Sequence, residues 1–259
     1  MTRSSKIRVP LAKENSWAIL NISNETLKEL ETKNNKFYFS PYEIDSKLRK
    51  VFPSYAFIEN GFLYANENKI INKNELKIFG THNIENALAC IAVCKTIHMK
   101  NEDIKAGLNT FDGVEHRLEF VRTIKGKSFY NDSKATNPES TIKAIQAIKE
   151  KQNQTNGKNI TLILGGRDKN TNLLEMIKII KQDIWEVILY GEAKDRFETE
   201  LRKDNFKDLK IVKDLNEAVE VSLQSNANMV LFSPACSSFD MFKNYEERGK
   251  YFKEILSKY

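Results

Sequence analysis

The stretch ITLILGG (160–166), followed by NLLEMIKIIK (172–181) and WEVILYG (185–191), decides the fold of the second half of the chain. The first and third pieces are almost continuously apolar, as parallel strands covered on both faces are, and the middle piece carries apolar residues at helical spacing. The same alternation continues on either side, from LEFVRTI (118–124) to the C-terminus. It predicts an α/β fold with a complete doubly wound, Rossmann-like domain over residues 113–259.

Residues 1–112 have a different pattern. The apolar pieces WAILN (17–21) and KFYFS (36–40) predict two strands on either side of a helix over residues 24–33. Residues 55–79 alternate with Asn-Gly and Asn-Glu-Asn breaks, as antiparallel hairpins do, and two stacked helices are expected between residues 84 and 112. Because no helix or strand is expected before WAILN, we expect residues 1–112 to be the later portion of a domain.

The composition narrows the class of protein. With 259 residues, 41% hydrophobic and 29% charged, the chain is globular and not a disordered polymer, and its net charge of +6 favours anionic ligands in general. A nucleic-acid binder is disfavoured because no face rich in Lys and Arg is evident. No apolar run reaches the roughly 18 residues of a membrane span and no secretory signal is recognisable, so we expect a cytoplasmic protein without membrane contact.

The cysteines and histidines give no metal signature. Three cysteines cannot all pair, which favours a reducing compartment, and Cys90 and Cys94 lie one helical turn apart in an apolar stretch, where buried free thiols are common. The histidines His82, His98 and His116 are scattered along the chain. Spacing therefore does not predict a zinc site.

Three expected strand ends carry residues suited to chemistry: YNDSKATNPEST (130–141), LGGRDKNTN (164–172) and FSPACSSFDMFKNYEERG (232–249). The carboxyl ends of parallel strands meet at one edge of a sheet, where helix N-termini and cationic side chains favour a carboxylate or phosphate. The alternative for each segment alone is that its Ser, Thr, Asp and Asn residues are helix caps and turn formers. Three such loops at one edge favour a ligand site.

Other candidates have two interpretations. Arg117 either contacts a phosphate or forms a structural ion pair at the domain junction. His82, Asn83 and Asn86 either cap a helix or hydrogen-bond a heterocycle. The sequence contains no GxxxxGK[ST], GxSxG or GxGxxG motif, so the chain has no phosphate-cradling loop of its own.

Taken with HNIENALA (82–89) and FDGVEHRLEFV (111–121), the three strand-end segments resemble the Mur ligase family. Within it, NDSKATN and SPACSSFDMFKNYEERG resemble the member that joins D-glutamate to UDP-N-acetylmuramoyl-L-alanine. The resemblance covers about residue 6 to the end and corresponds to the later part of the family's chain. It implies that residues 1–112 are the later portion of the central ATP-binding domain and residues 113–259 the C-terminal amino-acid-binding domain.

The resemblance also implies a reaction and its residues. In the family, ATP phosphorylates a carboxylate and an amine displaces the phosphate, with Mg²⁺ as the metal. Residues that match nucleotide-binding positions are Asn83, Asn86, Arg117 and Asp132; those that match positions around D-glutamate are Lys134, Thr136, Lys169, Ser238 and Tyr245. Catalytic positions fall on Lys134, Arg117 and Lys6, and Lys6 aligns with a lysine that the family carries as a carbamate bridging magnesium. Chance alignment is the alternative for Lys6 in so lysine-rich a chain.

The family's uridine-nucleotide-binding domain and P-loop are expected to be missing, so the resemblance implies a truncated ligase. We expect the isolated chain to be inactive by itself. A separate chain that supplies the missing half is the expected partner. The alternative is a nonenzymatic half-site that binds a nucleotide or an amino acid.

Overall fold

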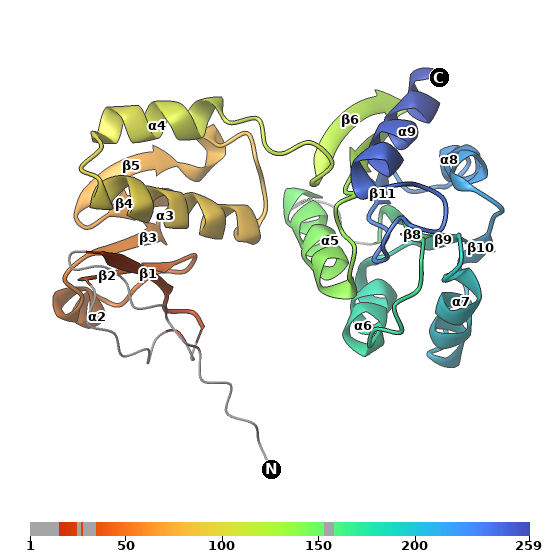
Figure 1. The fold of residues 1–259 in the computed structure, drawn as a ribbon, viewed down its shortest axis with the longest axis horizontal. Coiled ribbons are helices and arrows are strands. Elements are labelled where there is room, and N and C mark those ends of the chain that lie inside the picture. Colours follow the sequence, from red (N-terminus) through yellow and green to blue (C-terminus); the bar gives the residue numbers. More distant parts are fainter. Residues whose placement is uncertain (1–15, 25–26, 28–34, 153–157) are drawn as a thin grey trace, which may run out of the picture. The chain divides into compact units, whose positions relative to one another are not determined.

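The computed structural model describes residues 16–24, 27, 35–152 and 158–259. Lys6 and most of the helix expected over residues 24–33 lie outside the described residues. The chain forms two compact units, unit 1 (Met1–Asp112) and unit 2 (Gly113–Tyr259). Each has its own sheet and its own helices (Figure 1), which confirms the α/β class.

Unit 1 contains a five-stranded sheet in the order β1-β2-β3-β4-β5. Strands β1 and β2 are parallel, and β3, β4 and β5 form an antiparallel meander, as the hairpin pattern of residues 55–79 predicts. The Asn60-Gly61 turn between β3 and β4 has φ of 50° and 78°, the left-handed pair that a tight hairpin requires. The strands are β1 (Trp17–Asn21), β2 (Asn35–Ser40), β3 (Tyr55–Glu59), β4 (Phe62–Ala65) and β5 (Asn68–Asn72).

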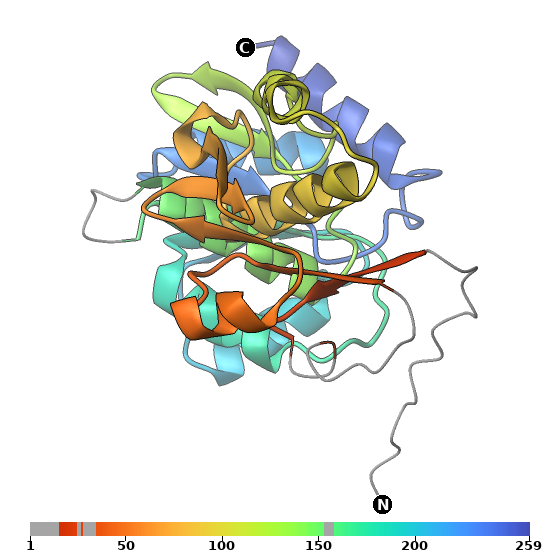
Figure 2. The same ribbon diagram turned by 90° about the vertical axis from the view of Figure 1, so that its left-hand side faces the viewer.

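Two helices, α3 (Thr81–Thr96) and α4 (Asn101–Thr110), bury their apolar faces in the core of unit 1. Helix α3 crosses strands β1 to β4, and α4 packs on β5 and α3 (Figure 2). A shorter helix, α2 (Ser46–Val51), connects β2 to β3, and a 3₁₀ turn, η1 (Lys73–Glu75), follows β5. The expectation that both α3 cysteines are buried is wrong, because Cys90 is exposed and Cys94 is half-buried. Both belong to α3, but its buried positions are taken by Ala87, Leu88, Ile91 and Ala92.

Unit 2 contains a six-stranded sheet in the order β10-β9-β8-β11-β7-β6. Five strands are parallel. The central strands β8 and β9 are completely buried, as their continuous apolar runs predict, whereas the edge strand β10 has no buried residue. The strands are β6 (Glu119–Ile124), β7 (Lys127–Asn131), β8 (Ile160–Gly165), β9 (Glu186–Tyr190), β10 (Leu209–Ile211) and β11 (Met229–Phe232).

The edge strand β6 departs from the expected parallel sheet because it pairs antiparallel with β7. Lys125 and Gly126, with φ of 48° and 78°, form the tight turn between them, and a connection this short cannot return the chain for a parallel pairing.

Helices cover both faces of the unit 2 sheet, as in a doubly wound fold. Helices α8 and α9 share one core with the strands, and α5 and α6 pack together across the sheet from them (Figure 1). The helices are α5 (Pro138–Gln152), α6 (Leu174–Asp183), α7 (Lys194–Lys203), α8 (Leu215–Leu223) and α9 (Tyr245–Ser257). Within the described residues, no helix is long and apolar enough to cross a membrane.

Candidate functional site

Three loops meet at the carboxyl edge of the unit 2 sheet, because β8, β11 and β7 are adjacent and parallel. We call them the β7 loop (residues 132–137), the β8 loop (166–173) and the β11 loop (233–244). The backbone joins them directly: Arg167 N donates to Ser237 O at 2.9 Å, and Asp132 N donates to Phe232 O at 2.7 Å. The sequence segments expected to share an edge do so.

Lys169 and Thr136 link the β8 and β7 loops. The exposed Lys169 places Nζ 3.4 Å from the Thr136 carbonyl oxygen, and Thr136 is half-buried. Ser238, in the β11 loop, is 2% exposed. A ligand at this edge therefore meets an accessible cation and a partly accessible hydroxyl, whereas Ser238 lies deeper.

Lys134 and Tyr245 come together from the β7 loop and the first turn of α9. The Lys134 Nζ lies 5.7 Å from the centroid of the Tyr245 ring, within the range of a cation–π contact. Lys134 N donates to His116 O at 3.0 Å, so its backbone is fixed while its side chain stays half-buried. Two residues that match amino-acid-binding positions are thus neighbours.

The β8 loop is held by an ion pair that the sequence analysis did not single out. Arg196, in the first turn of α7, donates through Nε and Nη2 to Asp168 at 2.6 and 2.7 Å, and through Nη1 to Thr171 O at 3.2 Å. The hydrogen bond from Arg196 lowers the pKa of Asp168. This bidentate pair fixes the loop at the residue before Lys169.

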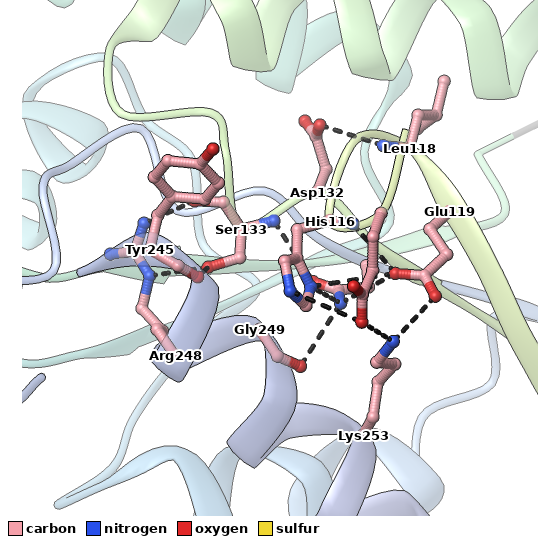
Figure 3. Close-up of polar contacts among 11 residues, drawn as sticks. His116, Leu118, Glu119, Asp132, Ser133, Tyr245, Arg248, Gly249 and Lys253 are labelled. Carbon is pink, nitrogen blue, oxygen red and sulfur yellow. Dashed lines mark hydrogen bonds and ion pairs between the residues drawn. The ribbon is translucent and has the colours of Figure 1, made fainter. Parts of the chain in front are cut away.

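Arg117 lies in a turn over residues 115–119, of which Figure 3 shows His116, Leu118 and Glu119. His116 and Leu118 adopt φ of 64° and 47°, which is unusual for residues other than glycine. The turn is held at both ends, since His116 N donates to Glu119 Oε2 at 2.9 Å and Leu118 N donates to Asp132 Oδ1 at 3.1 Å. Arg117 itself is exposed, so a rigid backbone carries an accessible guanidinium.

Asp132 is buried and engaged inside unit 2. Its Oδ1 accepts from Leu118 N, and its Oδ2 accepts from Ser233 Oγ at 2.7 Å. Burial raises the pKa of Asp132 to about 7, although both hydrogen bonds and the charges of Arg117 and Arg248 favour the carboxylate. In this structure Asp132 connects the Arg117 turn to the β11 loop.

The ring of His116 fills a space between the turn and α9. Its Nδ1 lies 3.0 Å from Asn131 Nδ2, and burial lowers its pKa, so the neutral ring accepts this hydrogen bond. Lys253, also on α9, donates to Glu115 and Glu119 at 2.6 and 2.9 Å (Figure 3). The turn is therefore anchored to the C-terminal helix.

Asn83 and Asn86 lie in the first turns of α3, in unit 1. Asn83 Nδ2 donates to Phe79 O at 2.8 Å, and Asn86 Nδ2 lies 3.4 Å from Asn83 Oδ1. The N-cap residue is Gly80, with φ of 93° and no side-chain cap, so Asn83 and Asn86 do not occupy the N-cap position. Asn86 is exposed and available to a ligand.

The implied magnesium site finds no support in the described residues. They contain no group of three or more His, Cys, Asp or Glu side chains that could hold a metal ion, and Lys6 lies outside them.

Sequence reasoning missed the residues that hold the loops in place, chiefly Ser133, Arg196 and Arg248. One signal was available for Arg248, since Arg248, Phe252 and Ile255 recur at helical spacing on the buried face of α9. An arginine on an apolar face that is otherwise regular indicates a buried polar contact.

Loops at the carboxyl edge of a doubly wound sheet define a ligand-binding α/β domain. Residues 116–236 of this domain match the family model described as Mur ligase, glutamate ligase domain. A solved structure, the MurF ligase from Thermotoga maritima in complex with ADP, shares the fold with a TM-score of 0.59 at 18% identity, over 95% of this chain and 55% of that one.

Curated relatives with higher sequence identity indicate a particular member of this family. The UDP-N-acetylmuramoylalanine–D-glutamate ligase of Caldanaerobacter subterraneus subsp. tengcongensis is 39% identical over 251 residues, 94% of this chain and 52% of the relative. The ligase of the same name from Clostridioides difficile is 38% identical over 93% of this chain and 52% of the relative. The chain is therefore a homologue of the Mur ligases, which confirms the resemblance carried by its motifs. It spans about half the length of these relatives.

Proposed function

We propose that this chain is the part of an ATP-dependent amide ligase of peptidoglycan precursor synthesis that receives D-glutamate and delivers it to UDP-N-acetylmuramoyl-L-alanine. The observation that carries the proposal is the junction of the β7, β8 and β11 loops, where Lys169 and Thr136 approach within 3.4 Å. The relatives named UDP-N-acetylmuramoylalanine–D-glutamate ligase support the choice of substrates.

The residues of unit 2 suit a dicarboxylic amino acid. Lys169 pairs with one carboxylate, and Thr136 and Ser238 donate to the other. Lys134 from the β7 loop and Tyr245 from α9 border the site. Fixed donors hold the amine of the amino acid in position for attack on an acyl phosphate, and positioning of this kind is a large part of catalysis.

A nucleotide belongs to the same proposal. In unit 1, Asn86 and Asn83 at the start of α3 carry amides of the kind that bind an adenine ring. In unit 2, the exposed Arg117 carries a guanidinium of the kind that binds phosphate oxygens. ADP in the Thermotoga maritima ligase supports ATP as the co-substrate. The proposal also includes Mg²⁺ bound at a carbamylated Lys6. It further includes a cytoplasmic location and a second chain that supplies a P-loop.

The full chain is expected to bind D-glutamate with a dissociation constant of about 1 mM or weaker, because so small a ligand makes few contacts. Lys169→Ala should lower the affinity more than Ser238→Ala, since a charge-assisted hydrogen bond is about twice as strong as a neutral one and Ser238 is buried. Ligand-observed NMR titrations measure both effects.

The matched control is Lys203→Ala. Lys203 pairs with Glu200 at the C-terminal end of α7, which lies toward the opposite edge of the sheet, so its removal should leave the affinity unchanged. Equal responses to D- and L-glutamate, or an unchanged affinity in Lys169→Ala, would contradict the proposed amino-acid site.

A further inference from the structure

Arg248 is the fourth residue of α9, and its side chain is fully buried, at 0% exposure. Among the described residues it forms no ion pair with a carboxylate. It bonds instead to two neighbouring loops: Nε donates to Ser133 Oγ at 3.0 Å, and Nη2 donates to Ser133 O at 2.7 Å and to Cys236 O at 3.0 Å. One guanidinium thus joins the β7 loop to the β11 loop; Figure 3 shows its contact with Ser133.

The same guanidinium lies next to Gly166 in the β8 loop. A Cβ atom placed on Gly166, whose φ is 130°, would lie 3.0 Å from Arg248 Nη1 and 3.1 Å from Cys236 Cβ. Gly166 therefore leaves the space that the Ser237 carbonyl oxygen, the guanidinium and the Cys236 side chain occupy, and the Ser237 oxygen is the nearest of the three. Nη1 is buried without a hydrogen-bond partner among the described residues.

A buried guanidinium makes the three loops interdependent. Its donors lie in one plane with fixed directions, so the acceptors on Ser133 and Cys236 are held at a set separation. Moving either loop away would leave a buried charge without its hydrogen bonds, which is costly in an apolar surrounding. The loops are expected to open together or not at all.

The proposed ligand contacts follow these anchor points closely. Thr136 comes three residues after Ser133, Lys169 three residues after Gly166, and Ser238 two residues after Cys236. We propose that Arg248 is a positioning residue, which sets the spacing of the three loops and through them the geometry of the amino-acid site. The claim that Arg248 sets the geometry of the amino-acid site rests on the proposed function. The claim that Arg248 couples the three loops does not depend on it.

Amide hydrogen exchange of the full chain tests the coupling, with one reporter in each loop. Lys134 N donates to His116 O, Arg167 N to Ser237 O and Phe242 N to Ser238 O, at 3.0, 2.9 and 2.8 Å. In Arg248→Lys, which keeps the charge and loses the planar fork, exchange at all three amides should rise about tenfold or more. Amides of the central strands β8 and β11 should stay protected. Unchanged exchange in the loops, or a rise in one loop alone, overturns the proposal.

Two further variants make the test decisive. Arg202→Met removes an exposed arginine of α7 that pairs with Glu198, and it should leave the three reporters unchanged. If Arg248→Lys does not fold, Ser133→Ala removes one acceptor of the guanidinium and should raise exchange at all three reporters about threefold. A rise confined to residues 132–137 in Ser133→Ala overturns the coupling.

D-glutamate titration of the same folded variants separates positioning from a general loss of stability. Arg248→Lys should bind at least fivefold more weakly than the wild type under conditions where both are folded. If the wild type binds and Arg248→Lys binds equally well, the positioning role fails and the proposed function stands. If the wild type does not bind D-glutamate and the three loops still loosen together, the proposed function fails and the role of Arg248 in coupling the loops stands.

Discussion

Gly249→Ala is expected to destabilise unit 2 by about 3 kcal/mol or more, at the upper end of what overpacking costs. Gly249 lies on the buried face of α9, against the imidazole of His116. A Cβ atom there would lie 2.7 Å from Cγ and 2.9 Å from Cε1 of a ring that is itself 2% exposed. Either α9 must move away or the ring must leave its hydrogen bond with Asn131, and both disrupt buried contacts.

Denaturant unfolding followed by tryptophan fluorescence measures this effect. The chain has 2 tryptophans, Trp17 in unit 1 and Trp185 in unit 2, so a Trp17→Phe background makes the signal specific to unit 2. The control is Gly107→Ala in α4, where an added Cβ meets nothing within 4 Å. Gly107→Ala should stabilise unit 1 by about 0.5–1 kcal/mol, because alanine favours helix over glycine. Unfolding of this control is followed by the circular dichroism signal of the helices.

A double-mutant cycle identifies the imidazole as the cause. His116→Gly removes the ring and tolerates the φ of 64° at this position. In that background Gly249→Ala should cost much less than in the wild type. If the two substitutions add to within about 0.5 kcal/mol, the clash with His116 is not the reason for any loss.

The sequence predicts the sheet of unit 2 well because its strands are buried on both faces and its helices are regular. The pattern of continuous apolar runs determines which residues enter the core, and the parallel order brings the segments around Lys134, Lys169 and Ser238 to one edge. The antiparallel pairing of β6 is harder to predict, since the residue types of LEFVRTI fit either strand direction. The direction of β6 follows from the two-residue turn Lys125-Gly126, because a connection this short cannot cross over to a parallel strand.

The contacts that hold the candidate site are less predictable than its location. Arg248 and Asp132 are charged residue types that are normally exposed, and their burial depends on partners more than 100 residues away, such as Ser133 for Arg248 and Ser233 for Asp132. Local pattern does not encode such pairings. It identifies Lys169 and Arg117, which are exposed on loops, more readily than the buried groups that position them.

Asp132→Asn is expected to change how the stability of unit 2 depends on pH. Burial raises the pKa of Asp132 to about 7 in the folded chain, against about 3.9 for an unfolded aspartate. The folded state therefore binds more protons than the unfolded state between these values, so this group stabilises the fold below about pH 4 and loses that contribution as the pH rises toward 7. The full change corresponds to about 4 kcal/mol at most.

Asparagine keeps an oxygen for Leu118 N and does not titrate, so the free energy of unfolding of Asp132→Asn minus that of the wild type should rise from pH 4 to pH 8. The slope is the informative quantity, because the amide also alters the hydrogen bond with Ser233 at every pH. The control is Asp195→Asn, which removes an exposed aspartate in the first turn of α7 and so measures the effect of losing one negative charge without burial. Urea unfolding of the Trp17→Phe forms at several pH values gives the difference. A flat or falling difference would mean that Asp132 is ionised in the folded chain at acid pH, and that its contacts with Leu118 and Ser233 outweigh the cost of burial.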